Sequence, residues 1–196
     1  MYAVISCSLD SNSKSSILGH HAYQRLSHDD HPCHWIALRD YDLPLSNGYN
    51  QSAYAHADVK YIHDLLLTCK GIIFSSPIYN WDVSAASKNL IELVGTSYKN
   101  ILSGKALNDK VIGFIGVGQV SKSYLAPLGF LNSLMLDFRC LILPRFVFAS
   151  HEDFQDNQPS EDILKRVNKL VSEFATLATA VHTSNIHELP SKKRAV

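Results

Sequence analysis

The sequence carries no net charge, because its 18 basic residues are balanced by 18 acidic ones. Without an excess of positive charge, there is no general electrostatic attraction to nucleic acid or anionic lipid. It also lacks an apolar run approaching the roughly 20 residues that span a bilayer. Residues 1–7 have neither the basic leader nor the small-residue cleavage site of a signal peptide. We therefore expect a cytoplasmic protein with neither nucleic acid nor a membrane as its partner.

Cysteine is scarce, and its four positions, Cys7, Cys33, Cys69 and Cys140, form no C-x-x-C pair. Three of the four lie in or beside apolar runs, which predicts buried free thiols in a reducing compartment rather than disulfides or a zinc site. Histidines and acids also gather at residues 28–34. Pro32 argues against a helix that would align them, so we expect a solvated loop and no metal.

The chain has 196 residues, of which 46% are hydrophobic and 18% charged, enough for one globular domain with a full core. We expect this domain over residues 1–183. Residues 184–196 are polar and include Lys192, Lys193 and Arg194. They are expected to form a frayed tail.

Short apolar runs alternate with longer amphipathic stretches, which predicts an α/β fold with a parallel sheet covered on both faces. Right-handed crossovers then give a doubly wound, five-stranded parallel sheet in the order 2-1-3-4-5, with its ligand site at the carboxyl ends of the strands. The strands are expected at 2–7, 34–38, 71–76, 110–117 and, interrupted by Pro144, 140–148. The helices are expected at 14–26, 52–69, 84–94 and 128–138, with a last helix after Ser160.

Hydroxyl groups crowd the loop between the first strand and the first helix. This loop contains Ser8, Asp10, Ser11, Asn12, Ser13, Ser15 and Ser16. One serine would be enough to cap the helix, so the cluster favours a phosphate at the helix N-terminus, where free N–H groups and the helix dipole attract a dianion. The glycine patterns of nucleoside triphosphatases and of dinucleotide-binding folds are both missing.

Two further loops follow the third and fourth expected strands. The first contains Pro77, Ile78, Tyr79, Asn80 and Trp81, which offer two flat aromatic faces and an amide that can read the edge of a heteroaromatic ring. The second contains Gly116, Val117, Gly118 and Gln119, where glycine lets the backbone approach a ligand closely. In the expected strand order all three loops are neighbours, and together they predict a site for a phosphorylated flavin.

The motifs in these loops resemble those of the flavodoxin-like NAD(P)H-dependent FMN reductase family. The family's first loop reads roughly G-S-x-R-x-x-S-x-N, and residues 7–15 here keep both serines as Ser8 and Ser13. Its middle motif reads roughly S-P-E-Y-N-G-S-x-P-G-x-L-K-N, and residues 76–80 and 87–89 are similar. Asp10 stands at the arginine position, and Trp81 at a glycine position. The likeness extends over residues 2–182.

The resemblance implies that a hydride passes from NAD(P)H through bound FMN to a small acceptor such as a quinone, an azo compound, a flavin or a metal ion. It implies no essential acid, base or nucleophile from the protein, because the flavin carries the chemistry. Backbone N–H groups near Asn80 and Gly118 would stabilise charge on the reduced ring. The resemblance also implies a homodimer or homotetramer. Two alternatives stay open: a non-enzymatic FMN electron carrier, and a flavodoxin-like module whose altered site binds another phosphorylated ligand.

Overall fold

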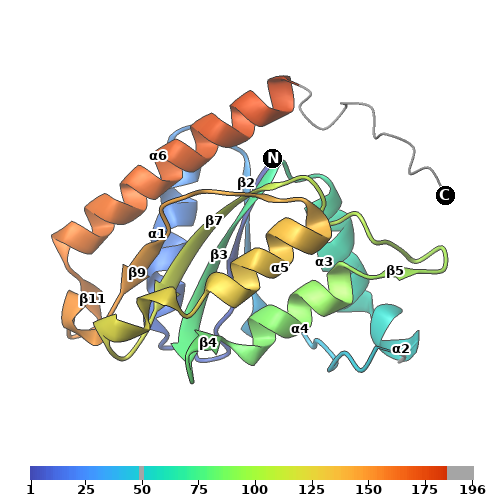
Figure 1. Cartoon of the computed structure of the whole chain (residues 1–196), viewed down its shortest axis with the longest axis horizontal. Helices are drawn as coiled ribbons and strands as arrows, with labels where there is room; N and C mark the ends of the chain where they lie inside the picture. Colours follow the sequence, from blue (N-terminus) through green and yellow to red (C-terminus); the bar gives the residue numbers. More distant parts are fainter. Residues whose placement is uncertain (49–50, 185–196) are drawn as a thin grey trace.

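Figure 1 shows the computed structural model, which describes residues 1–48 and 51–184. A central sheet lies between two layers of helices. Helices α1 (Lys14–His28) and α6 (Glu161–Thr183) cover one face. Helices α3 (Ala57–Leu67), α4 (Ala85–Val94) and α5 (Leu128–Phe138) cover the other. The expected α/β architecture with helices on both faces is confirmed.

The sheet has seven strands, of which five form the order β2-β1-β3-β7-β8. These are β2 (Cys33–Ala37), β1 (Tyr2–Ser6), β3 (Gly71–Tyr79), β7 (Val111–Val117) and β8 (Leu141–Ile142). A sixth strand, β9 (Val147–Ala149), pairs with β7 in parallel, and β4 (Asp82–Val83) pairs with β3 antiparallel. The simple five-strand description is therefore incomplete. The last position is divided between β8 and β9, and Pro144, which cannot donate a ladder hydrogen bond, lies in the interruption.

The buried strands alternate their side chains between two cores. On β3, Ile72 and Phe74 pack on the side of α3, α4 and α5, whereas Ile73 packs on the side of α1 and α6. This period of two follows from the pleat of a strand. Because both faces are covered, the first part of the strand, residues 71–74, is a continuous apolar run, and this run is the signal that predicts it.

Besides shifts of one or two residues elsewhere, two boundaries differ from the expectation. The stretch 52–69 forms two helices, α2 (Gln51–Tyr54) and α3, because His56 lies between them in an extended conformation and its side chain accepts a hydrogen bond from the N–H of Asp58. Strand β3 continues past Ser76 to Tyr79, so Pro77 and Ile78 belong to the strand.

Several short elements follow the ends of longer ones. They are the 3-10 helices η1 (Leu38–Asp40), η2 (Ser121–Leu125) and η3 (His151–Asp153), with the hairpins β5 (Ser97–Tyr98) to β6 (Leu102–Ser103) and β10 (Phe154–Gln155) to β11 (Gln158–Pro159).

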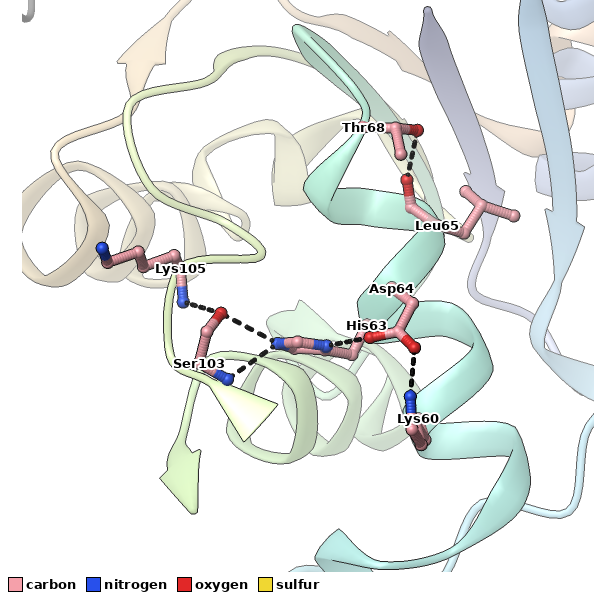
Figure 2. A network of polar contacts seen from close by, with 7 residues as sticks. All are labelled: Lys60, His63, Asp64, Leu65, Thr68, Ser103 and Lys105. Atoms are coloured by element: carbon pink, nitrogen blue, oxygen red, sulfur yellow. Dashed lines mark hydrogen bonds and ion pairs between the residues drawn. The ribbon is translucent and has the colours of Figure 1, made fainter. Parts of the chain in front are cut away.

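A buried histidine ties the β5–β6 hairpin to helix α3 (Figure 2). His63 is 2% exposed. Its Nδ1 lies 2.9 Å from a carboxylate oxygen of Asp64, and its Nε2 accepts the N–H of Ser103 at 3.1 Å. The hydroxyl of Ser103 lies 3.2 Å from the same Nε2 and accepts the N–H of Lys105. Because Nε2 of His63 already accepts the backbone N–H of Ser103, it is not available as a base for the Ser103 hydroxyl. The contacts among His63, Asp64 and Ser103 therefore hold the hairpin against the helix and do not activate the serine.

The expected tail lies almost wholly outside the described residues, which end at Ser184, the C-cap of α6. Within the described ranges, none of the helices combines the length and the apolar character needed to cross a membrane.

Candidate functional site

A cavity of about 410 Å³ lies at the carboxyl end of the sheet, within the roughly 300–1,000 Å³ of typical ligand pockets. The loops after β1, β7 and β9 and the end of strand β3 all contribute to it. Its lining residues are Asp10, Asn12, Ser13, Lys14, Ser15, Pro77, Ile78, Tyr79, Val117, Gly118, Gln119, His151 and Asn157. We call it the carboxyl-edge cavity.

The first loop brings the N-terminus of α1 to this cavity. Ser13 is the N-cap, and its hydroxyl accepts the N–H of Ser16 and lies 2.8 Å from the hydroxyl of Ser15. Further N–H groups of the first turn have no partner within the helix and are available to an anion. Ser8 and Ser16 turn elsewhere: the hydroxyl of Ser8 accepts the N–H of Asp10, and that of Ser16 lies 2.5 Å from the hydroxyl of Ser6.

A cationic side chain lies at the same end of the cavity. The Nζ of Lys14, the first residue of α1, lies 2.9 Å from Nδ1 of His151, which follows β9. It also lies 5.1 Å from the centre of the Phe154 ring, in a cation–π contact. The lysine is thus contacted by two residues that follow β9, His151 and Phe154. It supplies the positive charge that a phosphate would need.

Asp10 also lines the cavity, but its carboxylate is used within its own loop. One oxygen accepts the N–H of Asn12 at 2.9 Å, a local turn that aspartate commonly makes. Arg39 supports the loop from η1, which follows β2, and its Nη1 donates to the carbonyls of Asp10 and Ser11 at 3.3 and 3.1 Å. The carboxylate of Asp10 is therefore engaged by a backbone donor of its own loop.

The second loop is a tight hairpin between β3 and β4. Asn80 and Trp81 are its two turn residues and both have positive φ, at 49° and 64°. A two-residue turn with both φ values positive matches the twist of the flanking strands, and asparagine followed by glycine is its usual sequence. Trp81 occupies the glycine position and is 64% exposed. It is not among the residues that line the carboxyl-edge cavity.

A second cavity of about 680 Å³ lies on the other side of Tyr79, next to α4 and α5, and Asn80 lines it. Tyr79 borders both cavities and is 57% exposed.

In the third loop, the backbone at Gly118 packs closely against neighbouring side chains. A Cβ atom at this position would lie 2.7 Å from the hydroxyl oxygen of Ser123 and 2.8 Å from Cζ of Phe148. Only glycine fits without a shift of these neighbours. Gly116 lies within β7, two residues before Gly118. A Cβ atom there would face Phe114 and Phe148 rather than the cavity.

A buried serine network underlies the second loop. The hydroxyls of Ser76, Ser84 and Ser87 are 2.9–3.5 Å apart, and Ser84 donates to the carbonyl of Cys7 at 2.8 Å. Burial raises the pKa of the Cys7 thiol to about 12, so this cysteine stays protonated and is not a nucleophile. The network fixes the ends of β1 and β3 and the start of α4 relative to one another.

The structure brings together most of the residues that the sequence singled out. Asp10, Ser13, Ser15, Pro77, Ile78, Tyr79, Val117, Gly118 and Gln119 line one cavity. Ser8, Ser16, Asn80, Trp81 and Gly116 do not line it, and their contact with a ligand stays a prediction. Sequence reasoning did not select four lining residues, Asn12, Lys14, His151 and Asn157. Asn12 and Lys14 belong to the serine-rich loop, and this position was a signal for them. Only the fold shows that His151 and Asn157 reach the same cavity.

A parallel sheet with a polar cavity over its carboxyl edge defines a doubly wound α/β protein of the flavodoxin-like class. Residues 2–155 match the family described as NADPH-dependent FMN reductase, and the chain belongs to this family. Its cofactor is accordingly FMN, with NAD(P)H as the reductant, as expected from the sequence.

Individual relatives are similar over most of their length. An NAD(P)H-dependent FAD/FMN reductase of Geobacillus thermodenitrificans (strain NG80-2) is 26% identical over 154 residues, which are 78% of each chain. An NADH:FMN oxidoreductase in its apo form has a TM-score of 0.71 at 20% identity, over 90% of this chain and 88% of that one. A flavodoxin from the domain Archaea has a TM-score of 0.60 at 12% identity, over 91% and 99% of the two chains. At these identities the two structures show the fold.

The residues of the carboxyl-edge cavity fit FMN in their chemistry. Its lining includes the α1 N-terminus, the Ser13 hydroxyl and the Lys14 ammonium, which are donors for a phosphate. It also includes the apolar Pro77, Ile78 and Val117 together with backbone at Gly118, as a flat ring with polar edges requires. Phosphate donors and ring-contacting groups thus lie in a single cavity.

Proposed function

We propose that the protein binds FMN in the carboxyl-edge cavity and uses NAD(P)H to reduce a small acceptor. The observation that carries this proposal is the convergence of the loops after β1 and β7 and the end of β3 on one cavity whose lining includes the Lys14 cation and Gly118. FMN, when bound, supplies the hydride-accepting and electron-passing chemistry. The chain's own residues therefore have to bind, orient and polarise.

Ser13 and Lys14 would hold the phosphate, and Pro77, Ile78 and Tyr79 would contact the ring system. Backbone N–H groups near Asn80 and at Gly118 would stabilise negative charge on the reduced ring, because fixed donors in a partly dry site need no reorganisation. Tyr79 also borders the second cavity, so an acceptor could approach past it.

The acceptor is proposed as a quinone, an azo compound, a free flavin or a chelated metal ion. We also propose a homodimer or homotetramer, supported by exposed apolar side chains on α5, Leu128, Met135 and Leu136. The four free cysteines support a reducing, cytoplasmic location.

The proposal is tested by loading the purified chain with excess FMN, removing unbound flavin by gel filtration and measuring the flavin-to-protein ratio. NAD(P)H oxidation is then followed with a benzoquinone, an azo dye, riboflavin and ferric citrate in turn. Free FMN at the same concentration, without protein, is the control. Stoichiometric flavin with acceptor-dependent turnover above the control would support the proposal. A colourless protein that does not exceed the control would refute it.

A further inference from the structure

A second cleft, of about 280 Å³, lies between helix α6 and the turn that separates β8 from β9. We call it the α6 cleft. Its functional groups are the aromatic rings of Tyr124 and Phe146, the cations Arg145, Arg166 and Lys169, and the carboxylate of Glu173. The cations come from two parts of the chain, the turn after β8 and helix α6, so the fold rather than the helix alone brings them together.

The α6 cleft has an excess of positive charge. Lys169 and Glu173 form an exposed ion pair at 3.9 Å, which leaves the two arginines. Neither Arg145 nor Arg166 forms an ion pair with any residue in the ranges 1–48 and 51–184. Two guanidinium groups without carboxylate partners, lining the same cleft, match the charge of a phosphate monoester, to which arginine binds through paired N–H groups.

The same cleft offers a ring face. Tyr124 stacks on Phe146 with ring centres 5.4 Å apart and planes 20° apart, and it remains 52% exposed. A nucleobase stacks readily on an exposed aromatic side chain. Arginines for a phosphate and an aromatic face for a base together favour a phosphorylated nucleoside over inorganic phosphate or a plain acid.

A single aromatic wall separates this cleft from the carboxyl-edge cavity. Tyr124 contacts the edge of Phe148 at a ring-centre distance of 6.5 Å. Phe148 in turn packs against Gly118, which lines the carboxyl-edge cavity. A dinucleotide with one ring at the flavin could therefore extend its other end toward the α6 cleft.

We propose that the α6 cleft binds the 2′-phosphoadenosine end of NADPH, with Arg145 and Arg166 on the phosphate and Tyr124 against the adenine. This inference rests on the proposed function for the identity of the dinucleotide. It makes the enzyme prefer NADPH to NADH, because NADH has no 2′-phosphate for the two arginines.

The direct test uses the flavin-free chain and is independent of turnover. The protein is titrated with 2′,5′-ADP and, separately, with 5′-AMP by calorimetry. We expect 2′,5′-ADP to bind at least about 10-fold more tightly than 5′-AMP, since each hydrogen bond to a charged group strengthens binding by roughly 10- to 100-fold. Arg145→Met and Arg166→Met should each weaken 2′,5′-ADP binding by about 10- to 100-fold. Lys165→Met is the matched control, because Lys165 pairs with Glu161 on the same helix and does not line the cleft.

Steady-state kinetics of the FMN-loaded protein give the second readout. The arginine variants should raise KM for NADPH by a similar factor, with kcat and the KM for NADH unchanged. Equal binding of 2′,5′-ADP and 5′-AMP, or variants that weaken NADPH and NADH alike, would overturn the inference. Selective 2′,5′-ADP binding by a chain that fails to bind FMN would leave the phosphoadenosine site standing while refuting the proposed function, so the two failures are distinguishable.

Discussion

The Nζ of Lys14 lies 2.9 Å from Nδ1 of His151, although the two residues are 137 positions apart in the chain. In the family pattern of the first loop, an arginine stands where this chain has Asp10. Lys14 restores a cation at the mouth of the same loop, and His151 and Phe154 hold it there. We propose that this exchange of one cation position for another lets the loop bind a phosphate without the family's arginine.

The first prediction concerns this lysine. Lys14→Met removes the charge and keeps a side chain that packs on Phe154. We expect FMN affinity to fall by about 10-fold or more, because a charged hydrogen bond contributes roughly 1.5–3 kcal/mol. Riboflavin has no phosphate, so its affinity should not change. Fluorescence titration with both flavins measures the two dissociation constants.

Lys122→Met, on the exposed η2 segment and outside the carboxyl-edge cavity, serves as the charge-matched control for Lys14→Met. An equal loss of FMN and riboflavin binding in Lys14→Met would mean that the substitution disturbs the loop rather than a phosphate contact.

Gly118→Ala should weaken FMN binding by about 10-fold, or about 1.4 kcal/mol. The added Cβ would lie within 2.8 Å of both Ser123 and Phe148, so these side chains or the loop must shift, which changes the wall of the cavity at Gly118. Gly129→Ala is the matched control, since no heavy atom lies within 4 Å of its Cβ position in α5. That variant should gain about 0.5–1 kcal/mol of stability, as expected for alanine in a helix. Unchanged FMN affinity in Gly118→Ala would contradict the close approach.

Trp81 has a φ of 64°, where a residue with a side chain is strained by roughly 1–2 kcal/mol. Trp81→Gly relieves this strain, whereas Trp81→Ala removes the indole and keeps the strain. The glycine variant should therefore be the more stable of the two by about 0.5–1 kcal/mol, after the flexibility that glycine gives the unfolded chain. Urea denaturation of both variants measures the difference. An alanine variant as stable as the glycine variant would show that the turn is not strained.

The buried thiols predict a loss of stability at alkaline pH. Burial raises the pKa of Cys7 and of Cys140 from 9.0 to about 12. Between these values only the unfolded chain releases the protons, so unfolding becomes more favourable as pH rises. Each thiol lowers the free energy of unfolding by up to about 1.4 kcal/mol per pH unit above pH 9.

Urea denaturation at pH 8 and pH 10 measures this slope. Burial lowers the pKa of Lys110, which acts in the opposite direction, so wild type is compared with Cys7→Ala rather than judged alone. The variant should lose less stability between the two pH values. Identical pH dependence in both proteins would mean that Cys7 does not titrate on unfolding.

Much of the fold follows from local patterns. The apolar run that starts at Gly71 predicts β3, and the serines that follow β1 predict the N-terminal turn of α1. The convergence of the three loops is predictable as well, because the carboxyl ends of neighbouring parallel strands meet at one edge.

The features that could not be predicted depend on long-range contacts or on rare conformations. No spacing rule connects His151 to Lys14, since only the fold brings the segment after β9 to the start of α1. The break between α2 and α3 depends on the His56 side chain acting as a cap, a role that residue composition does not indicate. The hairpin at Asn80 and Trp81 places a tryptophan in a conformation that usually belongs to glycine.

The measurement that tests the central claim most directly is a visible absorption titration of the purified protein with FMN, followed by NADPH without oxygen. An FMN reductase should show a saturable spectral shift on binding, and NADPH should then bleach the flavin band faster than it bleaches free FMN. Binding without bleaching, with NADH tried as well, would contradict the reductase and favour an electron carrier. The absence of any binding would contradict the flavin site itself.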